Sequence, residues 1–183
     1  MLKKLCVLAT ALAMSANVVL ASTGEQRKDL QVFNDIAKTV NRYAQFSIFD
    51  DVSVAVKDGV VTLTGKVTMP YKRDDIEKRV AKIDGVSQVR NQISVLPVSQ
   101  FDDELRYRIA RSIYGNSNFQ NYATMVNPPI HVVVEHGRVT LTGVVNSEVD
   151  RVLARSLATQ FGAFSVTNNL KTDTEMREAL EKS

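Results

Sequence analysis

The 183-residue chain carries 23 lysines and arginines against 20 aspartates and glutamates, so its formal net charge is only +3. A charge this small gives little bulk attraction to nucleic acid, and we expect no nucleic-acid partner. The single cysteine excludes an internal disulfide framework.

The N-terminus, residues 1–21, has the pattern of a secretory signal peptide. Lys3 and Lys4 precede an apolar run over 5–13 that is too short to span a bilayer, and small residues end the segment. Cleavage after residue 21 would leave a formal charge of +3 − 2 = +1. Cys6 lies at the start of the apolar run, away from the position of a lipid-modified cysteine. The sequence therefore predicts a periplasmic protein with a cleaved signal and no lipid anchor.

The first predicted domain, 25–96, contains two helices and three strands. Apolar residues at every fourth position indicate an amphipathic helix, and alternating apolar residues on both sides of a glycine turn indicate a β-hairpin. A proline in the first turn of the next segment is typical of a helix start. The predicted elements are a helix over 25–43, a hairpin over 52–67, a helix from Pro70 to Gly85 and a strand over 85–93.

The second predicted domain, 99–171, repeats the first. Its hairpin, 130–145, follows the first hairpin at an offset of 130 − 52 = 78 residues, and both copies carry the run Thr-Leu-Thr-Gly after the turn. The insert 115–129 has no counterpart, and loops of this length are often functional or packed by their own side chains. The other predicted elements are a helix from about Asp102, a helix from about Ser147 and a strand over 162–170.

These patterns predict an α+β fold of two tandem α-β-β-α-β modules, each a three-stranded mixed sheet with two helices on one face. Val54, Val56, Val61 and Leu63 should face the core of the first module, whereas Thr62 and Thr64 should face out. Modules of about 65 residues are marginally stable alone, so we expect the two to contact each other. The polar C-terminal tail, 172–183, is compatible with a short surface helix.

Both copies share the motif V-x-V-x-x-G-x-V-T-L-T-G-x-V in the hairpin and G-x-x-x-V-x-N-x-[IL] in the trailing strand. With these motifs the chain resembles the BON domain, over nearly all of the predicted mature chain. The resemblance implies a non-enzymatic, exported or envelope-associated protein that binds phospholipid or maintains the envelope under osmotic stress. The insert 115–129 departs from the shortest members, so a lipid-binding surface transfers only in outline.

The residues indicate no catalytic, cofactor or metal site. His131 and His136 are the only histidines, and no cysteine or spaced carboxylate pair lies nearby to complete a metal shell. No nucleophile elbow surrounds a serine. The segment 59–66 looks like a phosphate loop but has the wrong glycine spacing and reads as a strand. Asn91 and Asn168 recur in the last strand of each module, and we predict that they tie that strand to a neighbouring loop.

The candidate binding site is the first helix of the second domain together with the insert that follows it. Basic and aromatic side chains mix there, which suits the interface of an anionic bilayer. In an alternative reading, Tyr107 and Tyr114 pack against the first module while the arginines pair with the acidic residues of 102–104. The candidate residues are Arg106, Tyr107, Arg108, Arg111, Tyr114, Phe119 and Tyr122.

Two functions are compatible with these features. The first is peripheral binding to an anionic phospholipid membrane, which the resemblance implies and the arginine- and tyrosine-rich helix supports. The second is a protein-binding or chaperone-like stress module, because the insert is expected to expose its aromatic residues and because exposed hairpin edges can accept an extra strand from an envelope protein.

Overall fold

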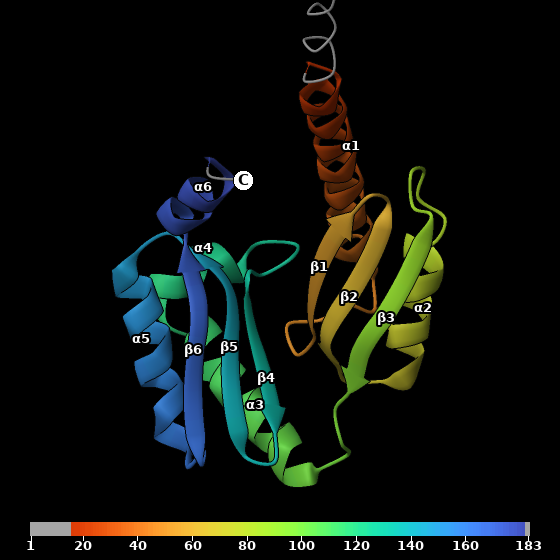
Figure 1. Cartoon of the computed structure of the whole chain (residues 1–183). Coiled ribbons are helices and arrows are strands. Elements are labelled where there is room, and N and C mark those ends of the chain that lie inside the picture. The colour runs from red at the N-terminus through yellow and green to blue at the C-terminus, as the bar shows by residue number, and fades with distance from the viewer. Residues whose placement is uncertain (1–15, 182–183) are drawn as a thin grey trace, which may run out of the picture.

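The computed structural model describes the backbone of residues 16–181 and the side chains of residues 28–179. It contains two three-stranded sheets, one in each half of the chain, with helices packed on them (Figure 1). In both sheets the first strand is antiparallel to the middle strand, and the last strand is parallel to it. The predicted α+β fold of two tandem mixed-sheet modules is therefore confirmed.

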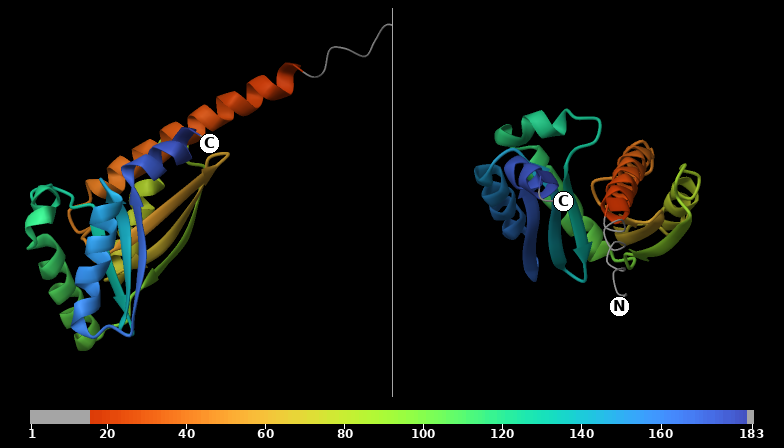
Figure 2. Two further views of the ribbon diagram at one scale, coloured as in Figure 1. Left: turned by 90° about the vertical axis from the view of Figure 1, so that its left-hand side faces the viewer. Right: turned by 45° about the horizontal axis from the view of Figure 1, so that its top comes forward.

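The first module follows the predicted order of elements with shifted boundaries. Its first helix starts before the predicted residue 25 and extends beyond the strands of its sheet (Figure 2). Of the predicted signal peptide, residues 1–15 lie outside the described residues and residues 16–21 belong to this helix. The second helix ends five residues before the predicted Gly85. The elements are α1 (Ala16–Asn41), β1 (Asp51–Lys57), β2 (Val60–Val67), α2 (Pro70–Val80) and β3 (Gln88–Val95).

The second module repeats this order, and its insert is not a plain loop, because it folds into two short helices. The tail is helical from Asp173, where Thr172 and Glu175 each accept a hydrogen bond from the other's backbone N–H group, at 3.2 and 2.9 Å. This reciprocal pair is a capping box. The elements are α3 (Gln100–Tyr114), η1 (Ser117–Phe119), α4 (Gln120–Ala123), β4 (Ile130–Glu135), β5 (Arg138–Val145), α5 (Glu148–Ala158), η2 (Thr159–Phe161), β6 (Ser165–Thr172) and α6 (Asp173–Glu181).

Each hairpin turn is held by a carboxylate from the first helix of its module. Both turns pass through two residues with positive φ, the backbone conformation that a tight hairpin turn requires. The Asp29 carboxylate accepts hydrogen bonds from the backbone N–H groups of Asp58 (2.8 Å) and Gly59 (3.1 Å). Asp102 does the same for the second turn, at 2.8 and 2.7 Å. The helix and the hairpin of each module are therefore tied together at the turn.

The recurring asparagines join the last strand to the second helix of each module. Asn91 donates to the backbone oxygen of Arg73 at 3.2 Å, and Asn168 donates to that of Arg151 at 2.8 Å. Each side-chain oxygen also accepts from a backbone N–H two residues later in its own strand. The structural role predicted for both asparagines is confirmed, although their partners lie in helices instead of loops.

Replacing Asn168 with alanine is expected to lower the free energy of unfolding by about 1–2 kcal/mol, because both hydrogen bonds of the amide are lost. Urea titration followed by circular dichroism measures the change. Its exposed neighbour Asn169 provides the control, since alanine there should change stability by less than about 0.5 kcal/mol. An equal effect of the two substitutions would contradict the structural role.

Each module has its own hydrophobic core between its sheet and its helices. Val61 and Leu63 are fully buried in the first core, as predicted, and Val54 and Val56 pack against it partly buried. Thr64 is exposed, as predicted, whereas Thr62 is partly buried. The second core includes Phe119 and Tyr122 from the insert, which has no counterpart in the first module. The insert therefore enlarges the second core.

The two modules contact each other through the segment that precedes β1. The backbone N–H of Val132 in β4 donates to the backbone oxygen of Ile48 at 2.7 Å. His131 Nδ1 lies 2.5 Å from the backbone oxygen of Asp50, so this nitrogen carries the proton and donates it. Lys66 and Glu135 form an ion pair between β2 and β4. The expected contact between modules is present.

Candidate functional site

Helix α3 and the insert hold all seven candidate residues. Ser99 caps the helix by accepting a hydrogen bond from the backbone N–H of Asp102 at 3.2 Å. The chain then turns at Gly115 into η1 and α4, which cover the end of the second core. One side of α3 faces this core, and the other side is open to solvent.

Four of the candidate side chains are wholly or partly buried within the second module. Arg106 is only 5% exposed, donates to the backbone oxygen of Val134 at 3.3 Å and pairs with Asp103 at 3.1 Å. Phe119 is fully buried. The Tyr122 hydroxyl donates to the Asp150 carboxylate at 2.9 Å and accepts from the backbone N–H of Asn146 at 2.7 Å. The half-buried Tyr114 is hydrogen-bonded to both backbone groups of Ile130, at 2.5 and 3.0 Å.

Burial raises the pKa of both tyrosines, Tyr114 and Tyr122, so they stay protonated at neutral pH. A protonated hydroxyl can donate and accept at once, which is how each one is used here. These residues and Arg106 and Phe119 are therefore occupied in holding α3 and the insert to the sheet. They are not free to form part of an exposed binding surface.

The other three candidates lie on the exposed side of α3. Tyr107 is 63% exposed, and its ring packs edge-on against Phe49 of the first module with the centroids 5.0 Å apart. Arg108 pairs with Glu104 one turn earlier. Arg111 is exposed. The alternative interpretation is thus correct for Tyr107, Arg106 and Arg108. It is wrong for Tyr114, which packs within its own module, and for Asp102, whose carboxylate binds the N–H groups of the hairpin turn and not an arginine.

An exposed aromatic pair lies beside these residues and was missed in the sequence. Phe101 is 51% exposed and Phe164 is 76% exposed, and their ring centroids lie 6.3 Å apart. They flank the turn glycine Gly137, where an added Cβ would lie 2.6 Å from Phe164 and 3.2 Å from Phe101. We call Phe101 and Phe164 the aromatic tip. Arg108 lines a small cavity with Phe101, so a cation lies close to the tip.

The signal for the aromatic tip was the difference between the two copies. Asp29 matches Asp102 in role, which places Lys28 at the position of Phe101, and the offset of the trailing strands places Ser87 at that of Phe164. An open pocket of about 610 Å³ occupies this region of the first module, whereas the cavity at the tip of the second module has about 20 Å³. The copies therefore differ clearly at this end of the module.

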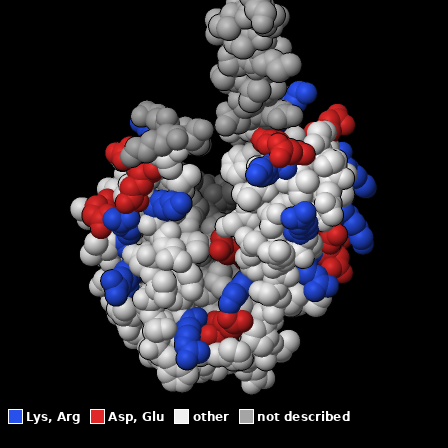
Figure 3. Space-filling model, viewed as in Figure 1, with Lys and Arg blue, Asp and Glu red and all other residues white. Residues whose placement is uncertain are grey.

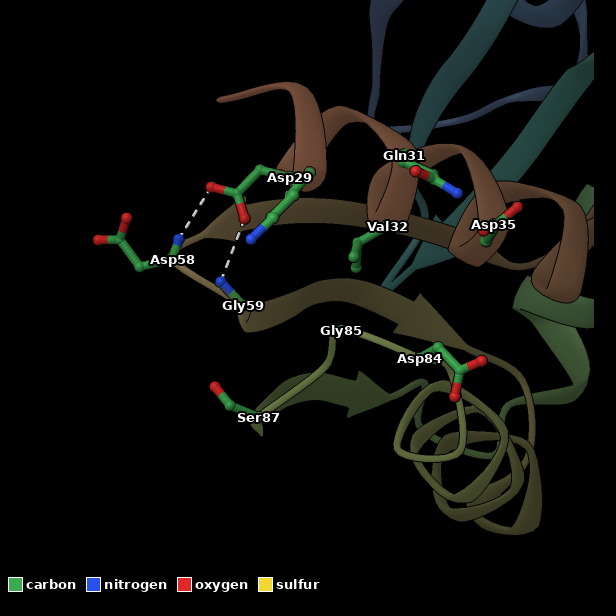
Figure 4. Close-up of a pocket in the computed structure, with 10 residues that line it drawn as sticks. Asp29, Gln31, Val32, Asp35, Asp58, Gly59, Asp84, Gly85 and Ser87 are labelled. Atoms are coloured by element: carbon green, nitrogen blue, oxygen red, sulfur yellow. Dashed lines mark hydrogen bonds between the residues drawn. The ribbon is translucent and has the colours of Figure 1, made fainter. Parts of the chain in front are cut away.

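The open pocket of the first module is rimmed by acidic residues that do not converge (Figure 4). Asp29 points at the hairpin turn and is occupied by its two N–H groups, whereas Asp58 and Asp84 extend in opposite directions. Within residues 28–179, no three His, Cys, Asp or Glu side chains are grouped to hold a metal ion.

A second hollow, of about 650 Å³, lies between the modules and is visible in the space-filling view (Figure 3). We call it the inter-module groove. Basic and acidic side chains are interspersed on the face shown, without a patch of one sign. The first module lines the groove with apolar residues of α1 and with β1, and the second lines it with its sheet and Met176 of α6.

No helix in the described part of the chain is long and apolar enough to cross a membrane.

Comparison with known families and structures identifies the modules. The family model of the BON domain matches residues 33–97 and 102–174, one stretch in each module. The chain belongs to the BON-domain family. BON domains suggest a non-enzymatic protein associated with the cell envelope. A search of curated proteins returns no match.

Two solved structures of the protein CdsD from Chlamydia trachomatis, described as a structural protein of the type III secretion system, are similar to this chain. One is 13% identical, with a TM-score of 0.28, and the match covers 81% of this BON-domain chain and 99% of the other. The second, of the C-terminal domain, is 12% identical with a TM-score of 0.26, and covers 76% and 96%. Matches at this level carry no argument about function.

Proposed function

We propose that this BON-domain protein is exported to the periplasm and binds peripherally to anionic phospholipid through the aromatic tip and the exposed side of α3. The observation that carries the proposal is the exposure of Phe101 and Phe164 next to a helix that also exposes Arg108 and Arg111. Aromatic rings and arginines suit the interface of a bilayer, where the rings enter the acyl boundary and the cations remain at the head groups. The signal-peptide pattern and the BON family support the exported location.

The aromatic tip is expected to contribute more than the arginines. Full burial of one phenylalanine side chain contributes about 1.5–3 kcal/mol, whereas a cation near an anionic surface contributes about 1 kcal/mol. The pairing of Arg108 with Glu104 reduces the charge contribution further. Binding should therefore be weak, reversible and only moderately sensitive to salt.

Liposome co-sedimentation tests the proposal. We expect more protein to sediment with vesicles that contain phosphatidylglycerol than with pure phosphatidylcholine vesicles. The double substitution Phe101→Ser with Phe164→Ser should lower the apparent affinity at least tenfold, and Arg108→Glu with Arg111→Glu should lower it several-fold. Negligible, equal binding of the wild type to both vesicles would refute the proposal.

A matched control replaces exposed apolar residues elsewhere on the second module. Val149 and Val152 on α5 are 74% and 58% exposed, and neither belongs to α3 or to the aromatic tip. Serine at both positions should leave sedimentation unchanged. A loss equal to that of the tip variant would show that binding reflects general surface hydrophobicity.

A role in envelope maintenance predicts slower growth at high osmolarity when the tip variant replaces the wild type.

A further inference from the structure

We propose that the free edge of β1, where it faces the inter-module groove, binds an extended peptide by strand addition. The proposal does not rest on lipid binding, because the edge lies on the first module, away from the aromatic tip. It rests on a difference between the two hairpins, which share one register but differ in what covers their outer edges.

The hairpin register fixes which backbone groups point away from each sheet. The residues next to a two-residue turn exchange hydrogen bonds, and the pairs then alternate along the ladder between hydrogen-bonded and non-hydrogen-bonded. In the first hairpin Lys57 pairs with Val60, so the backbone groups of alternate β1 residues point outward. In β4, where Glu135 pairs with Arg138, the same rule applies. The outward residues are Val52, Val54 and Val56 in β1 and Ile130, Val132 and Val134 in β4.

The outer edge of β4 is largely satisfied by groups outside its sheet. Both backbone groups of Ile130 bond with the Tyr114 hydroxyl. The N–H of Val132 donates to Ile48, and the oxygen of Val134 accepts from Arg106. Four of the six outward groups therefore have partners, which protects this edge from pairing with another strand.

The outer edge of β1 has none of these partners. Within the described part of the chain, no hydrogen bond satisfies the outward N–H and C=O groups of Val52, Val54 and Val56. The alignment of Asp29 with Asp102 places Phe33 at the position of Arg106 and Asn41 at that of Tyr114. The two side chains that cover β4 are thus replaced in α1 by residues that leave β1 uncovered.

The groove around this edge suits an extended peptide with alternating side chains. Val52 and Val54 line it together with Phe33, Ala37 and Phe46, so side chains on the helix side would contact apolar groups. The side chains between them would face Ser53, which is exposed. The outward residues run from Val52 to Val56, about 13 Å at the strand rise of about 3.3 Å per residue. Only another backbone presents donors and acceptors at the spacing of this edge, which an acyl chain does not.

The experiment uses the full chain and a fluorescein-labelled heptapeptide of alternating valine and threonine. We expect saturable binding by fluorescence anisotropy, with amide chemical-shift changes concentrated at residues 52–56. The same peptide with alternate amides N-methylated keeps its side chains but loses the donors of one edge. Its affinity for the unaltered protein should be at least tenfold lower.

Two variants at Val54 separate the contribution of its backbone N–H to peptide binding from the contribution of its side chain. Val54→Pro removes an outward N–H that is not part of the β1–β2 ladder, and it should weaken peptide binding at least tenfold. Val54→Thr keeps that N–H, so its affinity for the peptide should stay well above that of Val54→Pro. Binding of both variants to phosphatidylglycerol vesicles should equal that of the wild type, which keeps this test distinct from that of the lipid proposal.

Three results would overturn the proposal. They are the absence of binding at millimolar peptide, equal affinity of the N-methylated and unmethylated peptides, and chemical-shift changes centred on β3 or the aromatic tip. The methylated peptide decides the matter with the unaltered protein even if Val54→Pro perturbs the fold.

Discussion

Replacing Lys72 with methionine is expected to lower the free energy of unfolding by about 3–5 kcal/mol, because it leaves a buried carboxylate without its cation. Asp50 is fully buried, and its carboxylate accepts from Lys72 at 2.6 Å and from the hydroxyl of Thr68 at 2.9 Å. Ser47 adds two further hydrogen bonds at 2.8 Å. Urea titration at pH 7 measures the change.

The control for this substitution is an ion pair that water can reach. Lys38 and Asp35 lie 3.4 Å apart with their side chains 64% and 45% exposed. Lys38→Met should therefore change stability by less than about 1 kcal/mol. If Lys72→Met costs no more than this control, the buried pair does not stabilise the first module.

The same carboxylate predicts a dependence of stability on pH. Burial by itself raises the pKa of Asp50, but the hydrogen bonds from Lys72, Thr68 and Ser47 outweigh it, so the pKa is lowered from its usual 3.8. A lowered pKa in the folded state gives stability that is present above the unfolded pKa and is lost as the pH falls through the folded value. Asp50→Asn should flatten this loss in urea titrations below about pH 4. Identical acid profiles for the variant and the wild type would contradict it.

Replacing Phe119 with alanine is expected to cost about 3–5 kcal/mol, the usual range for a buried phenylalanine. Phe119 is fully buried in the second core, and its ring packs against Tyr122 with the centroids 5.8 Å apart. The alanine variant would leave a cavity between the insert and α3. Thermal and urea unfolding of the purified variant measure the loss.

Met125, in the same insert, provides the comparison for Phe119. Its side chain is 47% exposed, so Met125→Ala should change stability by less than about 0.5 kcal/mol. If Phe119→Ala were equally mild, the insert would be an independent loop, and its aromatic residues would again be candidates for binding a ligand.

The sequence was sufficient for the fold because the hairpins carry strong local signals. A turn glycine between alternating apolar residues defines each hairpin, and the repeat confirms each assignment with the other copy. The sequence was not sufficient for the start of α1 and the end of α2. Nothing in the local pattern separates residues 16–24 from the helix that follows, and α2 ends at Val80 because the chain turns there before Gly85.

The candidate site was only partly predictable, because burial in an irregular segment depends on contacts distant in the sequence. Phe119 and Tyr122 lie where no helical or strand period distinguishes a core residue from an exposed one. Arg106 reads as a surface cation, but its guanidinium lies against the edge of β4, which comes 28 residues later. Phe101 and Phe164 meet only because both flank the turn at Gly137. Comparing the two copies position by position shows that Phe101 and Phe164 replace Lys28 and Ser87 of the first module.

The hydrogen bond from Val132 to Ile48 means that the two modules are not independent parts, despite their repeat. A fragment that begins at Ser99, where the second predicted domain starts, would keep all of β4 but lose Ile48 and Asp50, and with them the partners of Val132 and His131. The N–H of Val132 would then lack its partner, and the edge of β4 would be less protected against pairing with the same strand in another molecule, which is a route to aggregation. The first module therefore lowers the tendency of the second to aggregate, because it covers part of the edge of β4.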